Sequence, residues 1–330
     1  MKLKEAMFAN FILKFGDHDL IDYLDEVVVG AFTDDALVSN RRGSSFYFLE
    51  VELVELDPNK GNWAIAGRFV QDTMLRRTQV YKEGQGLVHD EATLQSCPSA
   101  FFVLTLDDHR LIYFAETAYA PPIASFKATI TAFIKRKHLA FVDRQHAEAN
   151  KNDDQIVTRK QLTELHPTPS LSIIPLTNKE GIEEFLARYS VIRKVEIIVH
   201  KPNREVDAAD AVANIQALRK QLGSDKAKLS LTETEGLDHE GTKEVLEDIT
   251  DSPNIDTTVS GLDQAGDKLQ GSNEDFSVRA DVDLAQLETP NMARRLFAKM
   301  EQLRERGVLR LPDQRPEIRR RVQQIVDGLR

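Results

Sequence analysis

Residues 98–115 of the chain read PSAFFVLTLDDHRLIYFA, and this stretch decides the fold class of the N-terminal half. Two runs of large apolar side chains, Ala100–Leu106 and Leu111–Ala115, have the composition of buried β-strands. Asp107, Asp108 and His109 separate the two runs, and acidic residues in such a position are typical of a tight turn. The stretch therefore predicts a β-hairpin and, with it, an antiparallel sheet.

Further elements are predicted on either side of this hairpin. Upstream, the apolar pattern predicts a helix at 19–29 and strands at 7–15, Phe46–Val54 and Trp63–Val70. Downstream, Pro121 and Pro122 end the sheet and open an amphipathic helix over residues 122–138. We therefore expect an N-terminal half that is rich in antiparallel sheet and is closed by a helix.

The second half of the sequence alternates between strand and helix signals. Strands are predicted at Leu171–Leu176, Val191–His200, Ala227–Leu231 and Asp256–Val259, and helices at 178–189, 207–222, 240–249, 289–306 and from Pro316 onward. Residues 145–168 are polar, which suits an exposed connection between domains. The sequence thus predicts a mixed α/β or α+β fold. Its four parts are a sheet-rich domain (1–144), a polar linker (145–168), an α/β domain with strand–helix alternation (169–288) and a basic segment of C-terminal helices (289–330).

Composition favours a globular protein of the cytoplasm. The 330-residue chain is 41% hydrophobic and 29% charged, so it can bury a sizeable core in two domains. Its single cysteine, Cys97, cannot form an internal disulfide, and folding therefore does not depend on an oxidising compartment. The sequence contains neither a signal-peptide core nor an apolar run long enough to span a membrane. Any effect on a membrane then requires a separate partner.

Charge is distributed unevenly along the chain. The formal net charge is -10, so a nucleic-acid role requires that cations gather on one face. Residues 225–288 contain seventeen acidic and five basic residues, whereas residues 294–330 contain eleven basic and five acidic residues. Arg294, Arg295 and Lys299 of this basic tail fall within one predicted helix. The helix face is either solvated, or packed in a dimer against the acidic block, or in contact with phosphate.

No complete catalytic or metal-binding signature is present. The sequence lacks a phosphate-binding glycine loop, a Gly-x-Ser-x-Gly elbow and a Cys-x-x-Cys pair. His138, Asp143 and His146 have a loose metal-like spacing, but no closed ligand set accompanies them. Glu50 and Glu52 lie on a predicted strand, yet no further magnesium ligand is spaced to join them. We therefore predict a non-catalytic protein with no metal site and no cofactor.

A series of apolar and proline landmarks runs along most of the chain. The first is Phe46–Leu49, which is followed by a second strand and by a basic-polar, helix-like region. The second is Pro98–Val103, which leads through the hairpin to Glu116–Pro121. The last two are Ile173–Leu176 and Val195–Pro202. In this order of features, over roughly residues 40–300, the chain resembles the RexA family of lambdoid-phage exclusion proteins. The resemblance implies a cytoplasmic homodimer that binds double-stranded DNA without sequence preference. It further implies a sensor in phage defence that acts through a small membrane protein.

The resemblance also ranks the expected DNA-contacting residues. Lys201 and Arg204, in the loop after the strongest predicted strand, come first. Charge clustering alone adds Arg193, Lys194, Arg294, Arg295 and Lys299. Two other functions stay open at this point. One is a metal-dependent nuclease whose site is not recognisable in the sequence, and the other is a protein-interaction module in which the basic tail meets the acidic block.

Overall fold

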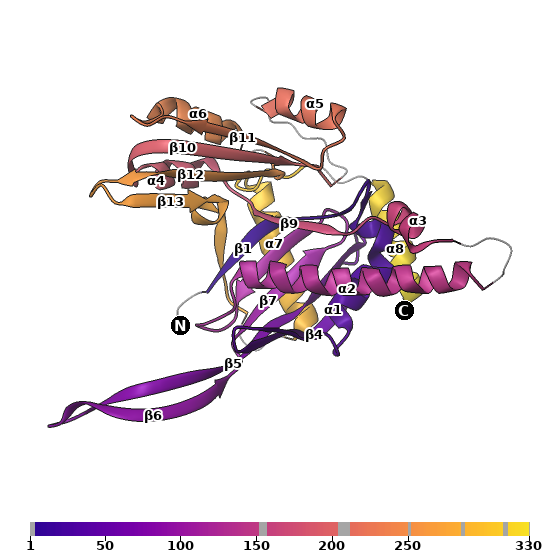
Figure 1. The fold of residues 1–330 in the computed structure, drawn as a ribbon, viewed down its shortest axis with the longest axis horizontal. Coiled ribbons are helices and arrows are strands. Elements are labelled where there is room, and N and C mark those ends of the chain that lie inside the picture. Colours follow the sequence, from indigo (N-terminus) through magenta and orange to yellow (C-terminus); the bar gives the residue numbers. More distant parts are fainter. Residues whose placement is uncertain are drawn as a thin grey trace.

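The computed structural model describes residues 4–151, 157–203, 212–249, 252–284, 288–312 and 316–329. Within these ranges the chain forms a ten-stranded and a four-stranded antiparallel sheet with helices packed on both (Figure 1). The predicted fold class is confirmed: a sheet-rich N-terminal half is followed by strand–helix alternation and by C-terminal helices.

The larger sheet is built mainly from the N-terminal half. Its main path runs β14-β1-β8-β7-β5-β4-β3, with β2 and β9 paired to β1 and β6 paired to β5. The strands are β1 (Lys4–Phe15), β2 (His18–Asp19), β3 (Ser39–Arg41), β4 (Ser44–Asp57), β5 (Asn62–Lys82), β6 (Gly86–Ser96), β7 (Ser99–Thr105), β8 (Arg110–Ala115), β9 (Ser170–Pro175) and β14 (Arg279–Val282). The hairpin β7–β8 turns at Asp107 and Asp108, as the sequence predicts.

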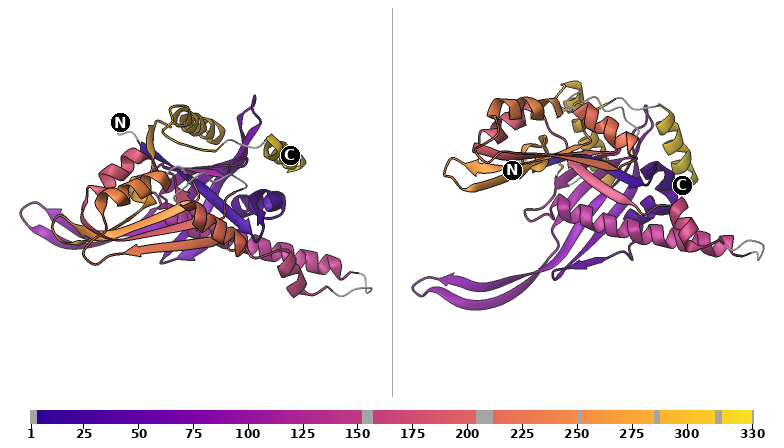
Figure 2. Two further views of the ribbon diagram at one scale, coloured as in Figure 1. Left: turned by 90° about the horizontal axis from the view of Figure 1, so that it is seen from above. Right: turned by 45° about the horizontal axis from the view of Figure 1, so that its top comes forward.

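Both faces of the larger sheet are buried, because its central strands carry continuous runs of apolar side chains. Phe102 of β7 belongs to the core cluster of helix α2 (Ile123–Ala149), whereas its neighbour Phe101 belongs to the cluster of helix α7 (Thr289–Glu305). The two helices therefore lie on opposite sides of the sheet, as Figure 2 shows. The shorter helices around the α2 side are η1 (Leu20–Tyr23), η2 (Leu24–Val28), α1 (Val29–Thr33), α3 (Arg159–Leu165) and α8 (Pro316–Leu329).

Two predicted helical regions differ in extent from the structure. The helix expected at 19–29 is present as a 3₁₀ turn, a π turn and a short α-helix that together continue to Thr33. Helix α2 continues to Ala149, into the range expected to be a linker. Within the same range Thr158 caps α3 by accepting a hydrogen bond from the backbone of Gln161, so part of the expected linker is helical.

The largest difference from the sequence prediction lies between residues 71 and 96. The sequence predicts a strand that ends at Val70 and then a helix-like region, but β5 continues to Lys82 and returns as β6. Beyond Thr73, β5 pairs only with β6 among the described strands. The resulting two-stranded ribbon projects from the body of the molecule (Figure 1). We call residues 74–95 the arm. Its polar composition reflects solvent on both faces of the ribbon, not a surface helix.

The smaller sheet has the strand order β11-β10-β12-β13. Its strands are β10 (Tyr189–His200), β11 (Lys226–Thr232), β12 (Ile255–Asp263) and β13 (Lys268–Ser272). The helices of this layer are α4 (Lys179–Leu186), α5 (Ala213–Gln221), α6 (His239–Ile249) and η4 (Asn273–Phe276). The predicted N-cap of the helix before Gly223, Asp207, lies outside the described residues.

The smaller sheet is an insertion into the larger one. Strand β9 precedes it, strand β14 follows it, and both hydrogen-bond to β1. Residues 169–288, which the sequence assigns to a separate α/β domain, therefore contribute two strands to the N-terminal sheet. The chain leaves the larger sheet after Pro175 and returns to it at Arg279.

Candidate nucleic-acid interface

Helices cover only one face of the smaller sheet. Val195, Ile197 and Val199 of β10 point to the covered face and join a core cluster with Phe185 of α4 and Leu246 of α6. Because side chains alternate along a strand, the β10 residues between them point the other way. The strand register brings to this second face Lys194, Glu196, Ile198, His200, Lys226, Lys228, Ser230, Thr232, Asp256, Thr258, Ser260, Lys268, Gln270 and Ser272. We call these residues the open face, since each of them is at least partly exposed.

The open face carries an excess of positive charge. It contains four lysines and two carboxylates, those of Glu196 and Asp256, so its formal net charge is +2. Glu196 accepts from Lys194 Nζ at 2.8 Å and from Lys228 Nζ at 2.6 Å. These two ammonium groups lower the pKa of Glu196, so this carboxylate stays ionised and holds the lysines side by side. Serine and threonine hydroxyls fill the positions between the charges.

The acidic block at 225–288 lies mostly elsewhere. Its described acids are carried by α6, by η4, by loops and turns, and by strands β12 and β14, and Asp256 is the one that the register places on the open face. Helix α6 alone contributes Glu240, Glu244, Glu247 and Asp248, on the covered side of the sheet. The fold thus partly separates charges that are mixed in the sequence: Lys226, Lys228 and Lys268 lie on the open face, whereas the carboxylates of α6 lie on the other side together with Lys243.

Lys127 of helix α2 extends the cations beyond the sheet. Its charge acts on both His200 and Asp256, which places it near the end of the open face where β10 ends and β12 begins. Burial, together with the charges of Lys127, Lys226 and Arg219, lowers the pKa of His200 to about 4. Burial raises the pKa of Asp256, against the opposing charge of Lys127. His200 is therefore neutral at physiological pH in the folded protein.

The neutral state of His200 predicts a pH dependence of stability. In the unfolded chain this imidazole titrates near pH 6.5, so its contribution to stability is present above that pH and is lost as pH falls toward about 4. We expect the free energy of unfolding of the wild type to fall by up to about 2 kcal/mol more than that of His200→Gln between about pH 7.5 and about pH 5. Urea unfolding of both proteins at the two pH values measures this difference. Equal losses would mean that His200 keeps an ordinary pKa in the fold.

Of the two residues that the resemblance ranks first, Lys201 does not lie on the open face. Lys201 donates to Asp17 Oδ1 at 2.6 Å, and this ion pair lowers the pKa of the Asp17 carboxyl. The same ammonium group donates to the backbone oxygen of Gly16 at 3.4 Å, which fastens the end of β10 to the turn after β1. This geometry favours a structural role for Lys201. Arg204 lies outside the described residues.

The other expected residues fall at three separate places. Lys194 is on the open face, about 24 Å along β10 from Lys201 at about 3.4 Å per residue. Arg193 is exposed at a break in the β10–β12 register. Arg294, Arg295 and Lys299 are on α7, across the larger sheet from α2, and Arg294 Nε donates to the backbone oxygen of Glu55 at 3.0 Å. The structure therefore places Lys194 on the same face as Lys226 and Lys228, and next to Lys228 through Glu196, but not with the basic tail.

A buried polar cluster surrounds the turn that the sequence shows only as Asp107-Asp108-His109. His109 is 3% exposed and its φ is +56°. Burial lowers the pKa of His109 to about 4. Burial and the neighbouring Asp108 raise the pKa of Asp107 to about 7, although Asn62 Nδ2 donates to its carboxylate at 2.7 Å. Sequence reasoning finds the turn but carries no signal for its burial.

This cluster fastens the smaller sheet to the larger one. Asn10 of β1 donates to the Pro253 backbone oxygen and to Asn254 Oδ1, each at 3.0 Å. Asn203 Nδ2 donates in return to the backbone oxygen of Phe11 at 3.0 Å and to Asn10 Oδ1 at 3.3 Å. The fully buried Arg110 also donates to Asn10 Oδ1. The inserted layer is thus held at this point by polar contacts, and we call this set of four side chains and two backbone oxygens the junction.

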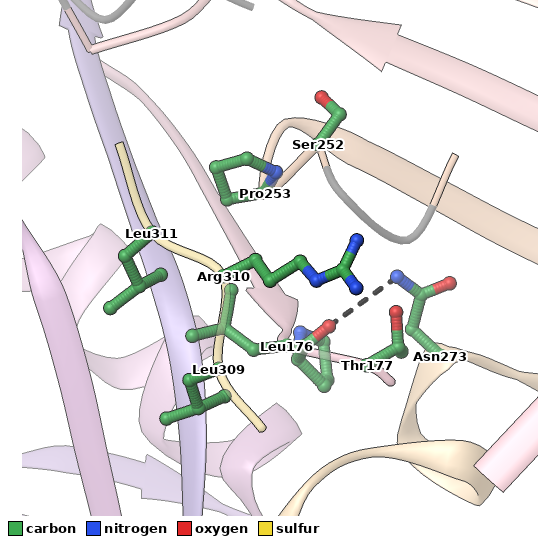
Figure 3. A pocket seen from close by; sticks show the side chains of 9 residues that line it. Leu176, Thr177, Ser252, Pro253, Asn273, Leu309, Arg310 and Leu311 are labelled. Carbon is green, nitrogen blue, oxygen red and sulfur yellow. Dashed lines mark hydrogen bonds between the residues drawn. The ribbon is translucent and has the colours of Figure 1, made fainter. Parts of the chain in front are cut away.

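Two adjoining pockets lie beside the junction. The first, drawn in Figure 3, is lined by Thr177, Ser252, Asn273 and Arg310 above a floor of leucines and prolines. Its cavity volume of about 10 Å³ is room for about one water molecule. The second has a cavity volume of about 200 Å³ and is lined by Lys179, Arg306 and Arg310 together with Glu180. It could hold a small anion but not a nucleic-acid duplex.

The described residues contain no group of three or more His, Cys, Asp or Glu side chains arranged to hold a metal ion. Among the same residues, no helix combines the length and the apolar composition needed to cross a membrane. The resemblance to the RexA family stays a prediction, because it is carried by short landmarks alone. Comparison with protein-family models and with curated proteins finds no match to this chain in either.

Proposed function

We propose that this chain is a non-catalytic protein that binds double-stranded DNA without sequence preference, and that the open face contacts the DNA. The observation that carries the proposal is the separation of charge across the smaller sheet. Lys194, Lys226, Lys228 and Lys268 lie on the face without helices, and the acids of α6 lie on the other side. Ammonium and hydroxyl groups match phosphate oxygens, and the release of counterions from the DNA drives association.

The side chains of the open face favour a duplex over a single strand. None of the open-face residues is Phe, Tyr or Trp, so the face offers no stacking platform for the unpaired bases of a single strand. Lysines act as point charges toward the backbone, and Gln270 is the sole carboxamide among these residues. Contacts of this kind position a protein on a duplex without reading its bases.

The biological setting in this proposal comes from the resemblance to the RexA family. It is a cytoplasmic homodimer that senses phage DNA and signals to a small membrane protein, as in abortive infection. Within the proposal, Lys194 keeps the DNA-contacting role expected from charge clustering, and Lys127, Lys226 and Lys228 join it. Lys201 instead holds the end of β10 in place through its ion pair with Asp17.

A salt series tests the proposal directly. If three to five lysines contact phosphates, the logarithm of the binding constant falls with the logarithm of salt concentration with a slope of about −3 to −4.5. Raising the salt from about 50 mM to about 200 mM then weakens binding roughly 60- to 500-fold. The measurement is the fluorescence anisotropy of a labelled random-sequence duplex of about 30 base pairs, with a single strand of equal length as comparison.

The same titration separates the alternatives. Binding in EDTA that leaves the duplex intact after magnesium is added supports the proposal. Loss of the duplex only with magnesium would instead support a nuclease. Absence of binding even at low salt would contradict a DNA-binding function and favour a protein-interaction module. Tight binding with a salt slope near zero would contradict the phosphate contacts proposed for the open face.

A further inference from the structure

The arm is an isolated two-stranded ribbon with large apolar side chains in solvent. Tyr81 is 73% exposed, Leu87 71%, Leu94 67%, Met74 50% and Leu75 45%. A two-stranded hairpin without a third strand or a helix against it is marginally stable in water. Exposed apolar side chains concentrated on one such element mark an interaction surface. Figure 1 and the right-hand view of Figure 2 show the arm projecting beyond the rest of the molecule.

On one face of the arm, the order of apolar and polar cross-strand pairs is the same from either end. Residues 75, 77, 79 and 81 of β5 point to the same side, because side chains alternate along a strand. Their cross-strand partners complete four rows, which are Leu75–Leu94, Arg77–Ala92, Gln79–His89 and Tyr81–Leu87. Between the second and third rows the register shifts, and two residues of β6, Asp90 and Glu91, lie opposite Thr78. An apolar row thus lies at each end and two polar rows lie between them. We call these eight residues the pairing face.

This pattern matches a second copy of the same arm running in the opposite direction. A two-fold axis through the middle of the pairing face places Tyr81 and Leu87 of one copy on Leu75 and Leu94 of the other. The two apolar rows are about 20 Å apart, six residues at about 3.4 Å each, so both contacts form at once. Arg77, which pairs with Asp90 at 2.6 Å, lies near the axis with Gln79 and His89.

The formal charge of the arm favours a protein over a nucleic acid as its binding partner. The arm contains three basic residues, Arg76, Arg77 and Lys82, and three acidic residues, Glu83, Asp90 and Glu91, so its formal charge is zero. A neutral ribbon gains nothing from counterion release, which argues against DNA as its ligand. The chain as a whole carries a charge of -10, and two copies repel each other. A neutral element that projects from the body is the place where two copies approach with the least repulsion.

We propose that the arm is a dimerisation element in which the pairing faces of two copies pack on each other, antiparallel, about a two-fold axis. The proposed function includes a homodimer but does not say which surface joins the two copies, and this inference assigns that surface to the arm. It rests on no DNA contact, so either proposal can fail without the other. The face is about 30 Å long and about 10 Å wide, which is about 300 Å² per copy and less than a standard interface. We therefore expect a dissociation constant in the micromolar range.

Sedimentation equilibrium of the full chain without DNA tests the proposal. Tyr81→Lys with Leu87→Lys places four ammonium groups in the dimer contact and is expected to weaken dimerisation at least about 30-fold. Met74→Lys with Val80→Lys adds the same charge on the opposite face of the arm and should leave the dimer unchanged. Circular dichroism confirms that both variants are folded. A wild type that stays monomeric at about 100 μM would overturn the proposal.

Disulfide cross-linking tests the antiparallel arrangement separately. In a Cys97→Ser background, Leu75→Cys and Tyr81→Cys are made as two single variants, one of them with a size tag. Mild oxidation of the mixture should yield mainly the mixed dimer, because Leu75 of one copy faces Tyr81 of the other. Dominance of the two self-linked species, or absence of cross-links, would contradict this arrangement. Unchanged dimerisation of Tyr81→Lys with Leu87→Lys would also overturn the proposal.

Discussion

Asn10→Leu is expected to lower the free energy of unfolding by about 3–5 kcal/mol, the largest stability loss that we predict for a single side chain. Asn10 is fully buried and bonds to four groups at once: Pro253 and Asn254 accept from it, and Asn203 and Arg110 donate to it. Leucine has a similar volume but neither donates nor accepts a hydrogen bond. Each deprived group then bears a desolvation cost of about 1–3 kcal/mol, part of which relaxation recovers.

Urea unfolding followed by circular dichroism measures this loss, and Asn291→Leu is the matched control. Asn291 is exposed on α7, so the same change of side chain there should alter stability by less than about 0.5 kcal/mol. A loss below about 1 kcal/mol for Asn10→Leu would mean that the junction is solvated and does not hold the inserted layer in place. A separate unfolding step of the smaller sheet in the variant would strengthen the structural assignment of the junction.

Elements marked by long apolar runs and by proline or glycine could be predicted from the sequence. The strand expected at Ala100–Leu106 is β7 at Ser99–Thr105, and the helix expected at 289–306 is α7 at Thr289–Glu305. Their apolar spacing is determined by local geometry, with a period of two for strands and 3.6 for helices. The proline at the start of α7 and the glycine after its end then fix the bounds.

The arm could not be predicted, because its stability does not come from a local core. Its apolar residues are too sparse for a buried strand, and its mixture of Arg, Gln, Thr and Glu is equally compatible with a solvated helix. What makes it a strand is continuation of the hydrogen-bond ladder from the larger sheet, a long-range feature. The insertion of the smaller sheet between β9 and β14 was missed for the same reason, since both strands find their partner in β1.

The candidate interface was only partly accessible to sequence reasoning. Lys194 could be named because it stands in a basic pair, but Lys226 and Lys228 are embedded in the acidic block, whose net charge hides them. Their common face is visible only once the register between β10 and β11 is known. Lys201 is the opposite case: it is next to the best strand in the sequence, and in the structure its ammonium group is paired with Asp17.

Reversing two charges on β11 is expected to cause the largest loss of DNA binding that we predict. Lys226→Glu with Lys228→Glu changes the open face by four charge units and leaves Glu196 beside a new carboxylate. We expect duplex binding to weaken at least about 100-fold at low salt, with a salt slope shallower by about 2, because two phosphate contacts are lost. The measurement is the same anisotropy titration, repeated with two duplexes of different sequence, and both should weaken equally.

The same charge change on the basic tail is the control that separates an effect of the open face from an effect of overall charge. Arg295→Glu with Lys299→Glu alters the net charge of the chain by the same amount, but on α7, across the larger sheet from α2 and Lys127. If overall charge alone governed binding, both double variants would weaken it equally. If the tail contacts phosphate, the α7 variant would lose more. A loss confined to the β11 variant is the outcome that the open face requires, because local potential within about 10 Å decides a phosphate contact at physiological salt.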